Sequence, residues 1–238
     1  MSEQSCLVEH FSRLRALSDD EIQLIRDLEK DVRLFPAETR LQAIGAPAES
    51  FFTLNQGWAC AVRILANGHR QVLDLFLPGQ VMGLREIGFD SNHSEIVALS
   101  DIEACPFPRS RLQELFDQAP QLGELFLIIM AREQALLTER MINIGRRSAQ
   151  ERLAHFLLEL YVRLACPVDD LELPMNQTII GDALGLSAVH VSRTLSGLKE
   201  IKLVDSDNGC IRIRDPEGLA KLADFDHAYL NCSLPWSA

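Results

Sequence analysis

Hydrophobic and polar positions change their period along the chain, and the first half has the pattern of short strands. Between about Val32 and Pro108, short apolar runs are separated by turn residues. The runs cover residues 51–54, 59–65, 72–77, 96–99 and 102–107. The Asn67-Gly68 pair between two of them is a strong signal for a β-hairpin. Many short strands at this spacing predict an antiparallel, jelly-roll-like β-roll or barrel.

Helical periodicity flanks this region on both sides. Ser18 and Glu21 stand three residues apart ahead of an apolar stretch, which predicts a capping box at the start of a short helix. After Pro120 the apolar positions recur at three- and four-residue steps, and they predict one helix of roughly 20 residues or more that ends near Gly145. Its apolar positions lie on more than one face, so it needs partners on more than one side. We expect one face to pack on the β-roll and another to pair with the same helix of a second chain. The alternative is a helix buried within one subunit.

The last third of the chain predicts a helix-turn-helix. A helix from Ser148 to about Ala165, ended by Pro167, is followed by a polar linker over residues 169–174. A second helix over residues 177–184 has Asn176 as its N-cap, and Gly185-Leu186-Ser187 then breaks the pattern. In the next helix, residues 188–199, the inward stripe is formed by Val191, Leu195 and Leu198, whereas His190, Arg193, Thr194 and Gly197 are expected on other faces.

A hairpin after the last helix would make this a winged helix-turn-helix. Residues 201–204 have the pattern of a strand, 205–209 that of a turn, and 210–214 that of the return strand. Arg212 and Arg214 would share one strand face and could meet phosphates, or they could be solvated charges beside Asp205 and Asp207. The predicted fold is α+β, with an antiparallel β-roll over residues 1–118, a long dimerisation helix and the segment after it over 119–147, and a winged helix-turn-helix over 148–238.

Charge and motif content narrow the function classes. The 238 residues carry a formal net charge of −11, and the part from Ser148 onward has 8 Lys and Arg against 13 Asp and Glu. Phosphate contacts dominate non-specific DNA affinity, so any DNA contact must come from a small positive face. No P-loop, GxGxxG, HExxH or GxSxG motif is present in the sequence, and an enzyme is not expected.

Cellular location is also indicated by the sequence. The six cysteines form no CxxC pair, and the first thirty residues lack the basic start and apolar run of a signal peptide. The longest apolar stretch, Leu125–Ala131, is too short to span a bilayer. These features favour a cytoplasmic protein with reduced thiols and no membrane partner.

The sequence resembles the CRP/FNR family of bacterial transcription regulators over nearly its whole length. The stretch Gly181–Leu195 resembles the recognition motif of that family, residues 145–154 its hinge, and residues 77–83 its β-roll turn. The resemblance implies base or phosphate contacts for Ser187, His190, Ser192 and Arg193, with Arg193 reading guanine. Many members carry at Val189 a glutamate that reads cytosine, so the resemblance implies a different operator here, with a thymine methyl contact at Val189.

Further partners and residues complete the predicted interface. The partners are double-stranded DNA, a second copy of the chain and RNA polymerase. The full set of expected DNA-binding residues is Thr178, Ser187, Val189, His190, Ser192, Arg193, Lys199 and Arg212. A signal in the β-roll would act by shifting the hinge at residues 143–147. The alternative function is a cyclic-nucleotide-like or haem-sensing module that regulates a partner protein without binding DNA.

The signal itself is not indicated by the sequence. Cyclic-nucleotide-binding relatives carry Gly-Glu-Leu and then Arg-Ser or Arg-Thr, but this chain has Gly83-Leu84-Arg85 and Asn92-His93-Ser94. A buried phosphate without a cation is costly, so no cyclic nucleotide is expected. An effector pocket, if there is one, would be formed by Met82, Gly83, Leu84, Arg85, Glu86, Asn92 and His93.

The sequence offers little support for an iron–sulfur cluster or a haem group. Only Cys6 is N-terminal, and one thiolate cannot hold an iron–sulfur cluster. The pairs Cys105-Pro106 and Cys166-Pro167, assisted by His69 and His93, could ligate haem, but a buried cysteine behaves more often as a small hydrophobe. No cofactor is therefore expected.

Overall fold

The chain divides into two compact units, which are described separately. The computed structural model describes residues 5–164, 170–207 and 210–231. The N-terminal unit comprises the chain up to Glu133 apart from Arg70–Val72, and the C-terminal unit comprises those three residues and Gln134–Asn231. The boundary falls inside the long helix α4 (Pro120–Arg146), which contributes its first half to one unit and its second half to the other.

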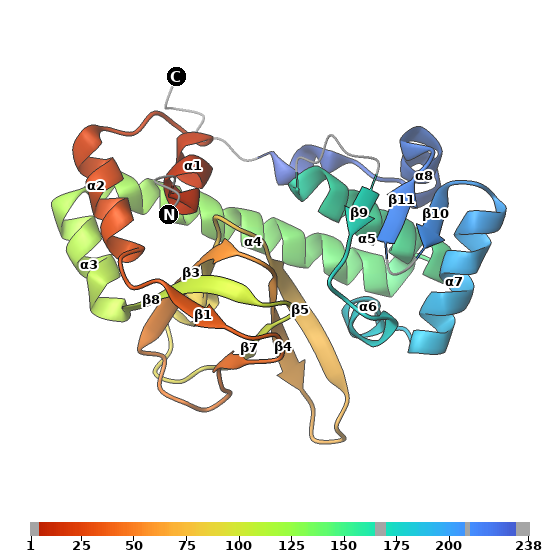
Figure 1. The fold of residues 1–238 in the computed structure, drawn as a ribbon, viewed down its shortest axis with the longest axis horizontal. Helices are drawn as coiled ribbons and strands as arrows, with labels where there is room; N and C mark the ends of the chain where they lie inside the picture. The colour runs from red at the N-terminus through yellow and green to blue at the C-terminus, as the bar shows by residue number, and fades with distance from the viewer. Residues whose placement is uncertain (1–4, 165–169, 208–209, 232–238) are drawn as a thin grey trace. The chain divides into compact units, whose positions relative to one another are not determined.

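Two four-stranded antiparallel sheets form the β-roll of the N-terminal unit (Figure 1). One sheet has the order β1-β8-β3-β6 and the other β2-β7-β4-β5. The strands are β1 (Arg33–Phe35), β2 (Arg40–Gln42), β3 (Ser50–Gln56), β4 (Ala59–Ile64), β5 (Arg70–Phe76), β6 (Val81–Met82), β7 (Glu95–Ala98) and β8 (Ile102–Pro108), with a short 3-10 helix, η1 (Leu84–Glu86), after β6. The predicted β-roll is confirmed. The hairpin at Asn67-Gly68 is confirmed as well, because the backbone N–H of Leu65 donates to the His69 carbonyl at 2.8 Å across the turn.

Three further helices belong to this unit: α1 (Cys6–Ser12), α2 (Asp19–Leu28) and α3 (Arg109–Gln118). The capping box at the start of α2 is confirmed, with the Ser18 hydroxyl accepting from the Glu21 backbone and the Glu21 carboxylate accepting from that of Ser18. Arg15 donates two hydrogen bonds to the Glu21 carboxylate and lowers the pKa of that group to about 2. Neither α1 nor α3 was expected from the periodicity; both depend on packing in the core, through residues such as Leu7, Phe11, Leu112 and Leu115.

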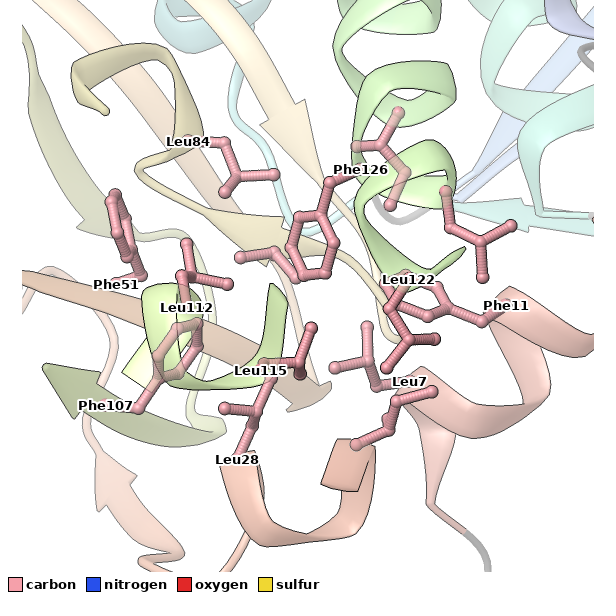
Figure 2. Close-up of a cluster of buried hydrophobic side chains, with 14 of the residues drawn as sticks. Leu7, Phe11, Leu28, Phe51, Leu84, Phe107, Leu112, Leu115, Leu122 and Phe126 are labelled. Atoms are coloured by element: carbon pink, nitrogen blue, oxygen red, sulfur yellow. The ribbon is translucent and has the colours of Figure 1, made fainter. Parts of the chain in front are cut away.

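A cluster of large apolar side chains joins these helices to the β1-β8-β3-β6 sheet (Figure 2). Phe51 and Phe107 project from the sheet, while Phe11 and Phe126 meet edge to face with ring centroids 5.4 Å apart. The cluster also contains Leu7, Leu28, Leu84, Leu112, Leu115 and Leu122. The first half of α4 is therefore packed on the β-roll unit along one face, as predicted.

The C-terminal unit contains a helix-turn-helix with a three-stranded wing, in the order β10-β11-β9 (Figure 1). Its elements after α4 are α5 (Ala149–Arg163), β9 (Asp170–Glu172), α6 (Gln177–Leu184), α7 (Ala188–Glu200), β10 (Val204–Asp207), β11 (Cys210–Ile213), α8 (Pro216–Ala223) and η2 (His227–Leu230). The predicted winged helix-turn-helix is confirmed in outline, although two details of the prediction are wrong.

Both corrections concern the wing. Residues 201–203 form a turn rather than a strand, because the backbone N–H groups of Lys202 and Leu203 donate to the last carbonyls of α7. The strand starts at Val204 and includes Asp205 to Asp207, which were assigned to the turn. The supposed linker contains β9, which pairs with β11. The wing tip at 208–209 and the Cys166-Pro167 pair lie outside the described residues.

The length and apolarity of the helices decide whether any of them could cross a membrane. No helix in the described ranges is both long and apolar enough to cross a bilayer.

Candidate nucleic-acid interface

The turn between α6 and α7 is held closed by short backbone contacts. The Asn176 side chain caps α6 by accepting from the Ile179 N–H at 3.0 Å, and Gly185 ends the helix in the left-handed conformation with φ of 66°. The backbone N–H of Leu186 then returns to the Gly181 carbonyl at 3.0 Å. A Cβ on Gly181 would lie only 2.4 Å from the Leu186 carbonyl oxygen. The turn after α6 therefore passes position 181 at a distance that only glycine permits.

The first turn of α7 presents polar side chains to solvent. Ser187 caps the helix by accepting from the His190 N–H at 3.2 Å, and this turn contains no acidic residue. Ser187, Val189, His190 and Arg193 are exposed, and Val189 is 61% exposed despite being apolar. A helix N-terminus carries a partial positive charge, which favours phosphate groups nearby. This end of α7 therefore combines a positive helix end with side chains that can reach a partner.

Two residues of α7 lie deeper than expected. Thr194 was assigned to an outer face, but it is only 5% exposed, and that assignment is wrong. Its hydroxyl donates to the His190 carbonyl at 2.7 Å, which satisfies the polar group inside the helix and allows its burial. Ser192 is half-buried. Val191 and Leu198 form the buried stripe that was predicted, with Leu195 partly exposed.

The cations near the wing have acidic partners. The Lys199 ammonium donates to the Ser206 carbonyl at 3.0 Å and lies 3.9 Å from the Asp205 carboxylate. Arg214 lies 3.3 Å from the same carboxylate and lowers its pKa. Arg212 is half-buried and faces Asp205 in the strand register. Lys199 and Arg214 therefore share one carboxylate, whereas Arg193 is exposed on α7.

Thr178 lies close to α7 because the two share a groove. This groove has a volume of about 570 Å³ and is formed by the first turn of α6, the inner face of α7 and the wing. Thr178, Ala188, Ser206 and Asp207 are among its lining residues. Thr178 and α7 thus line the same groove, although Asp207 places a negative charge there.

The polar side chains of the expected effector residues form hydrogen bonds or ion pairs with neighbouring groups of the protein. Glu86 is 2% exposed; its carboxylate accepts from the Ser94 hydroxyl at 2.8 Å and lies 3.2 Å from His93 Nδ1. Arg85 donates to the Asp74 carboxylate at 3.0 Å. The remaining members, Met82, Gly83, Leu84 and Asn92, lie in the same turn region, where all four are buried.

These contacts do not fit a cyclic nucleotide. Its phosphate needs an available cation, whereas the Arg85 guanidinium is already paired with Asp74 and the buried Glu86 carboxylate would repel it. Asp74, 11 residues before Arg85 in the sequence, was not expected as its partner.

The cysteine and histidine residues considered as haem ligands do not form a metal site among the residues that the structure describes. Cys105 is fully buried and donates to the Glu29 carbonyl at 3.3 Å, and burial raises the pKa of its thiol. His69 and His93 are exposed. Within the described part of the chain, no group of three or more His, Cys, Asp or Glu side chains is arranged to hold a metal ion. A thiol that favours its protonated form is a poor metal ligand.

Comparison with known proteins gives two family matches. Residues 151–222 match the Crp-like helix-turn-helix domain, and residues 32–119 match the cyclic nucleotide-binding domain. The nitrogen fixation regulation protein FixK of Rhizobium meliloti is 35% identical over 186 residues, which are 77% of this chain and 83% of FixK.

Two more relatives extend the comparison. The transcriptional activator protein FnrA of Stutzerimonas stutzeri is 29% identical over 208 residues, covering 86% of this chain and 82% of FnrA. The solved structure of FixK2 from Bradyrhizobium japonicum superposes with a TM-score of 0.75 at 30% identity, over 80% of this chain and 96% of FixK2.

Proposed function

This chain belongs to the CRP/FNR family and is a DNA-binding transcription regulator, and we propose that it acts as a homodimer on a two-fold symmetric operator. In this proposal each subunit places the N-terminal half of α7 in the major groove of one half-site. The observation that carries the proposal is that the N-cap and first two turns of α7 have no acidic residue and expose Ser187, His190 and Arg193.

Base reading is assigned to Arg193 and Val189. The Arg193 guanidinium can donate to both acceptors of guanine, which is worth roughly 1–3 kcal/mol of discrimination. Val189 stands four residues before Arg193, so both side chains lie on one helix face. Its exposed isopropyl group suits a thymine methyl and offers cytosine no acceptor.

The other predicted residues are assigned to the DNA backbone. Ser187 and Ser192 have hydroxyl groups, and the N-terminal amides of α7 can donate to phosphate. Thr178, His190, Lys199 and Arg212 complete the proposed phosphate-facing set. Lys199 is expected to contribute least, because the Asp205 carboxylate lies 3.9 Å from its ammonium group.

The homodimer is supported by the exposed face of α4. Exposed residues recur along it at alternating steps of four and three, as in a two-stranded coiled coil: Leu127, Ala131, Gln134, Thr138, Met141 and Gly145. Leu127 is 71% exposed and Met141 69% exposed. Leu127 and Met141 are the two large apolar side chains of this stripe, and they suit the same stripe of a second chain. A Met141→Glu substitution is expected to weaken dimerisation in sedimentation experiments.

RNA polymerase is the second proposed partner. Relatives described as transcriptional activators, such as FnrA, support this assignment. A cyclic nucleotide is not part of the proposal, because the Glu86 and Arg85 side chains do not fit its phosphate. Calorimetric titration with cyclic AMP is therefore expected to show no binding.

The test of the proposed function is selection of binding sites from random DNA, followed by mobility shifts at several salt concentrations. We expect a symmetric site whose affinity falls steeply with salt. Arg193→Ala should weaken binding to that site by about 5- to 150-fold, in line with 1–3 kcal/mol. Arg13→Ala, which changes the exposed arginine that follows α1, is the control and should leave binding unchanged. Failure of the wild-type chain to select any site would refute the proposal.

A further inference from the structure

Two helix C-termini meet at the side chain of Arg152, a residue of α5 that is not part of the proposed DNA face. Arg152 Nε donates to the Arg147 carbonyl at 2.9 Å, immediately after the end of α4. One terminal nitrogen of the same guanidinium donates to the Leu184 carbonyl at 3.2 Å, in the last residue of α6. One side chain therefore links the end of the long helix to the first helix of the helix-turn-helix.

Both acceptors are groups that need such a donor. The last carbonyls of a helix have no partner within it, and they form the negative end of the helix dipole. Leu184 is 2% exposed, so its carbonyl has little access to water. A guanidinium supplies several donors in a fixed fork and a permanent charge, whereas a lysine supplies one ammonium point.

Neighbouring contacts hold Arg152 in position from the side of α4. Asn143, a buried residue of α4, donates its side-chain amide to the Arg152 backbone carbonyl at 3.2 Å. The side chain of Ile144 lies beside the helix-turn-helix turn, since a Cβ on Gly185 would be 3.6 Å from Ile144 Cγ2. The last turns of α4 thus place Ile144 beside the turn between α6 and α7, and they are linked to α6 through the side chain of Arg152.

Leu184 is separated from the start of α7 only by Gly185-Leu186-Ser187. This turn is rigid, because the Leu186 N–H is bound to Gly181 and the Ser187 side chain caps α7. A displacement of the Leu184 carbonyl relative to α4 would therefore be transmitted to the first turn of α7.

We infer that Arg152 is a positioning residue that couples the end of α4 to the recognition helix and so sets the spacing of the two recognition helices in a dimer. The inference rests on the proposed function. Two half-sites lie about one helical turn of DNA apart, so a dimer whose recognition helices are held rigidly tolerates one spacing only. Without the Arg152 link, each α7 should still read its half-site but should no longer be held at that separation.

The experiment compares full-length wild-type protein with Arg152→Met, which keeps the length of the side chain and removes its donors. Arg152→Lys keeps the charge but not the fork, and Arg146→Met changes an exposed arginine at the end of α4 as the control. Each protein is titrated with the selected operator, with single half-site DNA, and with operators lengthened or shortened by one base pair.

For Arg152→Met we expect half-site affinity within twofold of wild type, operator affinity at least tenfold weaker, and little preference among the three spacings. Arg152→Lys should recover part of the spacing preference, and Arg146→Met should match wild type. An unchanged spacing preference in Arg152→Met would overturn the inference. So would a parallel loss of half-site and operator affinity, which would indicate a damaged fold. Lack of half-site and operator binding by the wild type refutes the proposed function instead.

Discussion

Replacing Gly181 with alanine tests the claim that the helix-turn-helix depends on one close backbone approach. The new Cβ would lie 2.4 Å from the Leu186 carbonyl oxygen, whereas ordinary contacts begin near 3.4 Å. The carbonyl would have to move by about 1 Å, and it belongs to backbone that cannot rotate away. Forcing such overpacking typically costs about 1–3 kcal/mol, and the upper end applies to a backbone atom. Alanine regains about 1 kcal/mol of helix propensity.

The net loss in the free energy of unfolding is therefore about 2 kcal/mol for the C-terminal unit. In a domain of this size, 1 kcal/mol lowers the melting temperature by roughly 4–8 °C. We expect a decrease of about 8–16 °C by calorimetry, together with weaker operator binding, because Ser187 follows the displaced carbonyl directly.

Gly197→Ala is the matched control within the same unit. Its Cβ would lie 2.8 Å from Gln150 Nε2, which is the free end of an exposed, flexible side chain. Gln150 can move aside, so we expect a melting temperature equal to or slightly above that of wild type. A Gly181→Ala protein that melts at or above the wild-type temperature would refute the steric argument.

Three other predictions concern pH, the helix end and base reading. Burial, with Arg147 nearby, lowers the pKa of His155 from 6.5 to about 4. Between these two pH values only the unfolded chain gains the proton, so the free energy of unfolding should fall as the pH drops through this window, by up to about 3 kcal/mol. His155→Leu should remove this pH dependence in a series of denaturant-unfolding curves. Gly185→Ala should cost about 1 kcal/mol because φ is 66°, and Gly185→Asn should cost less, as equilibrium urea unfolding can measure. Val189→Glu should shift the selected half-site from thymine toward cytosine; an identical selected site in both proteins would contradict the assignment.

Features set by neighbouring residues were predictable from the sequence. The capping box of Ser18 and Glu21, the N-caps at Asn176 and Ser187, and the left-handed glycine at 185 each depend on a few adjacent positions. The β-roll hairpin and the long helix were equally accessible, since a turn pair and a sustained period are local signals.

Predictions failed where a side chain or strand takes its partner from a distant segment. As a polar residue, Thr194 was predicted to face outward. Its hydroxyl instead donates to the His190 carbonyl within the helix, which allows the side chain to be buried. Strand β9 is too short to be recognised alone, and it exists because β11 offers an unpaired edge. Strand β10 begins only at Val204, because the backbone N–H groups of Lys202 and Leu203 donate to carbonyls at the end of α7.

The sequence by itself determined the order of β-roll, long helix and winged helix-turn-helix, the position of α7 and the absence of the cyclic-nucleotide residues, because each is encoded in local residue types. Tertiary structure decided which charges remain available. It pairs Arg85 with Asp74, and Lys199 and Arg214 with Asp205, whereas Arg193 stays exposed on α7. It also brings Arg152 to the Leu184 carbonyl, 32 residues away in sequence. Electrostatic and hydrogen-bond partners follow from distances in space, which no local pattern of residues specifies.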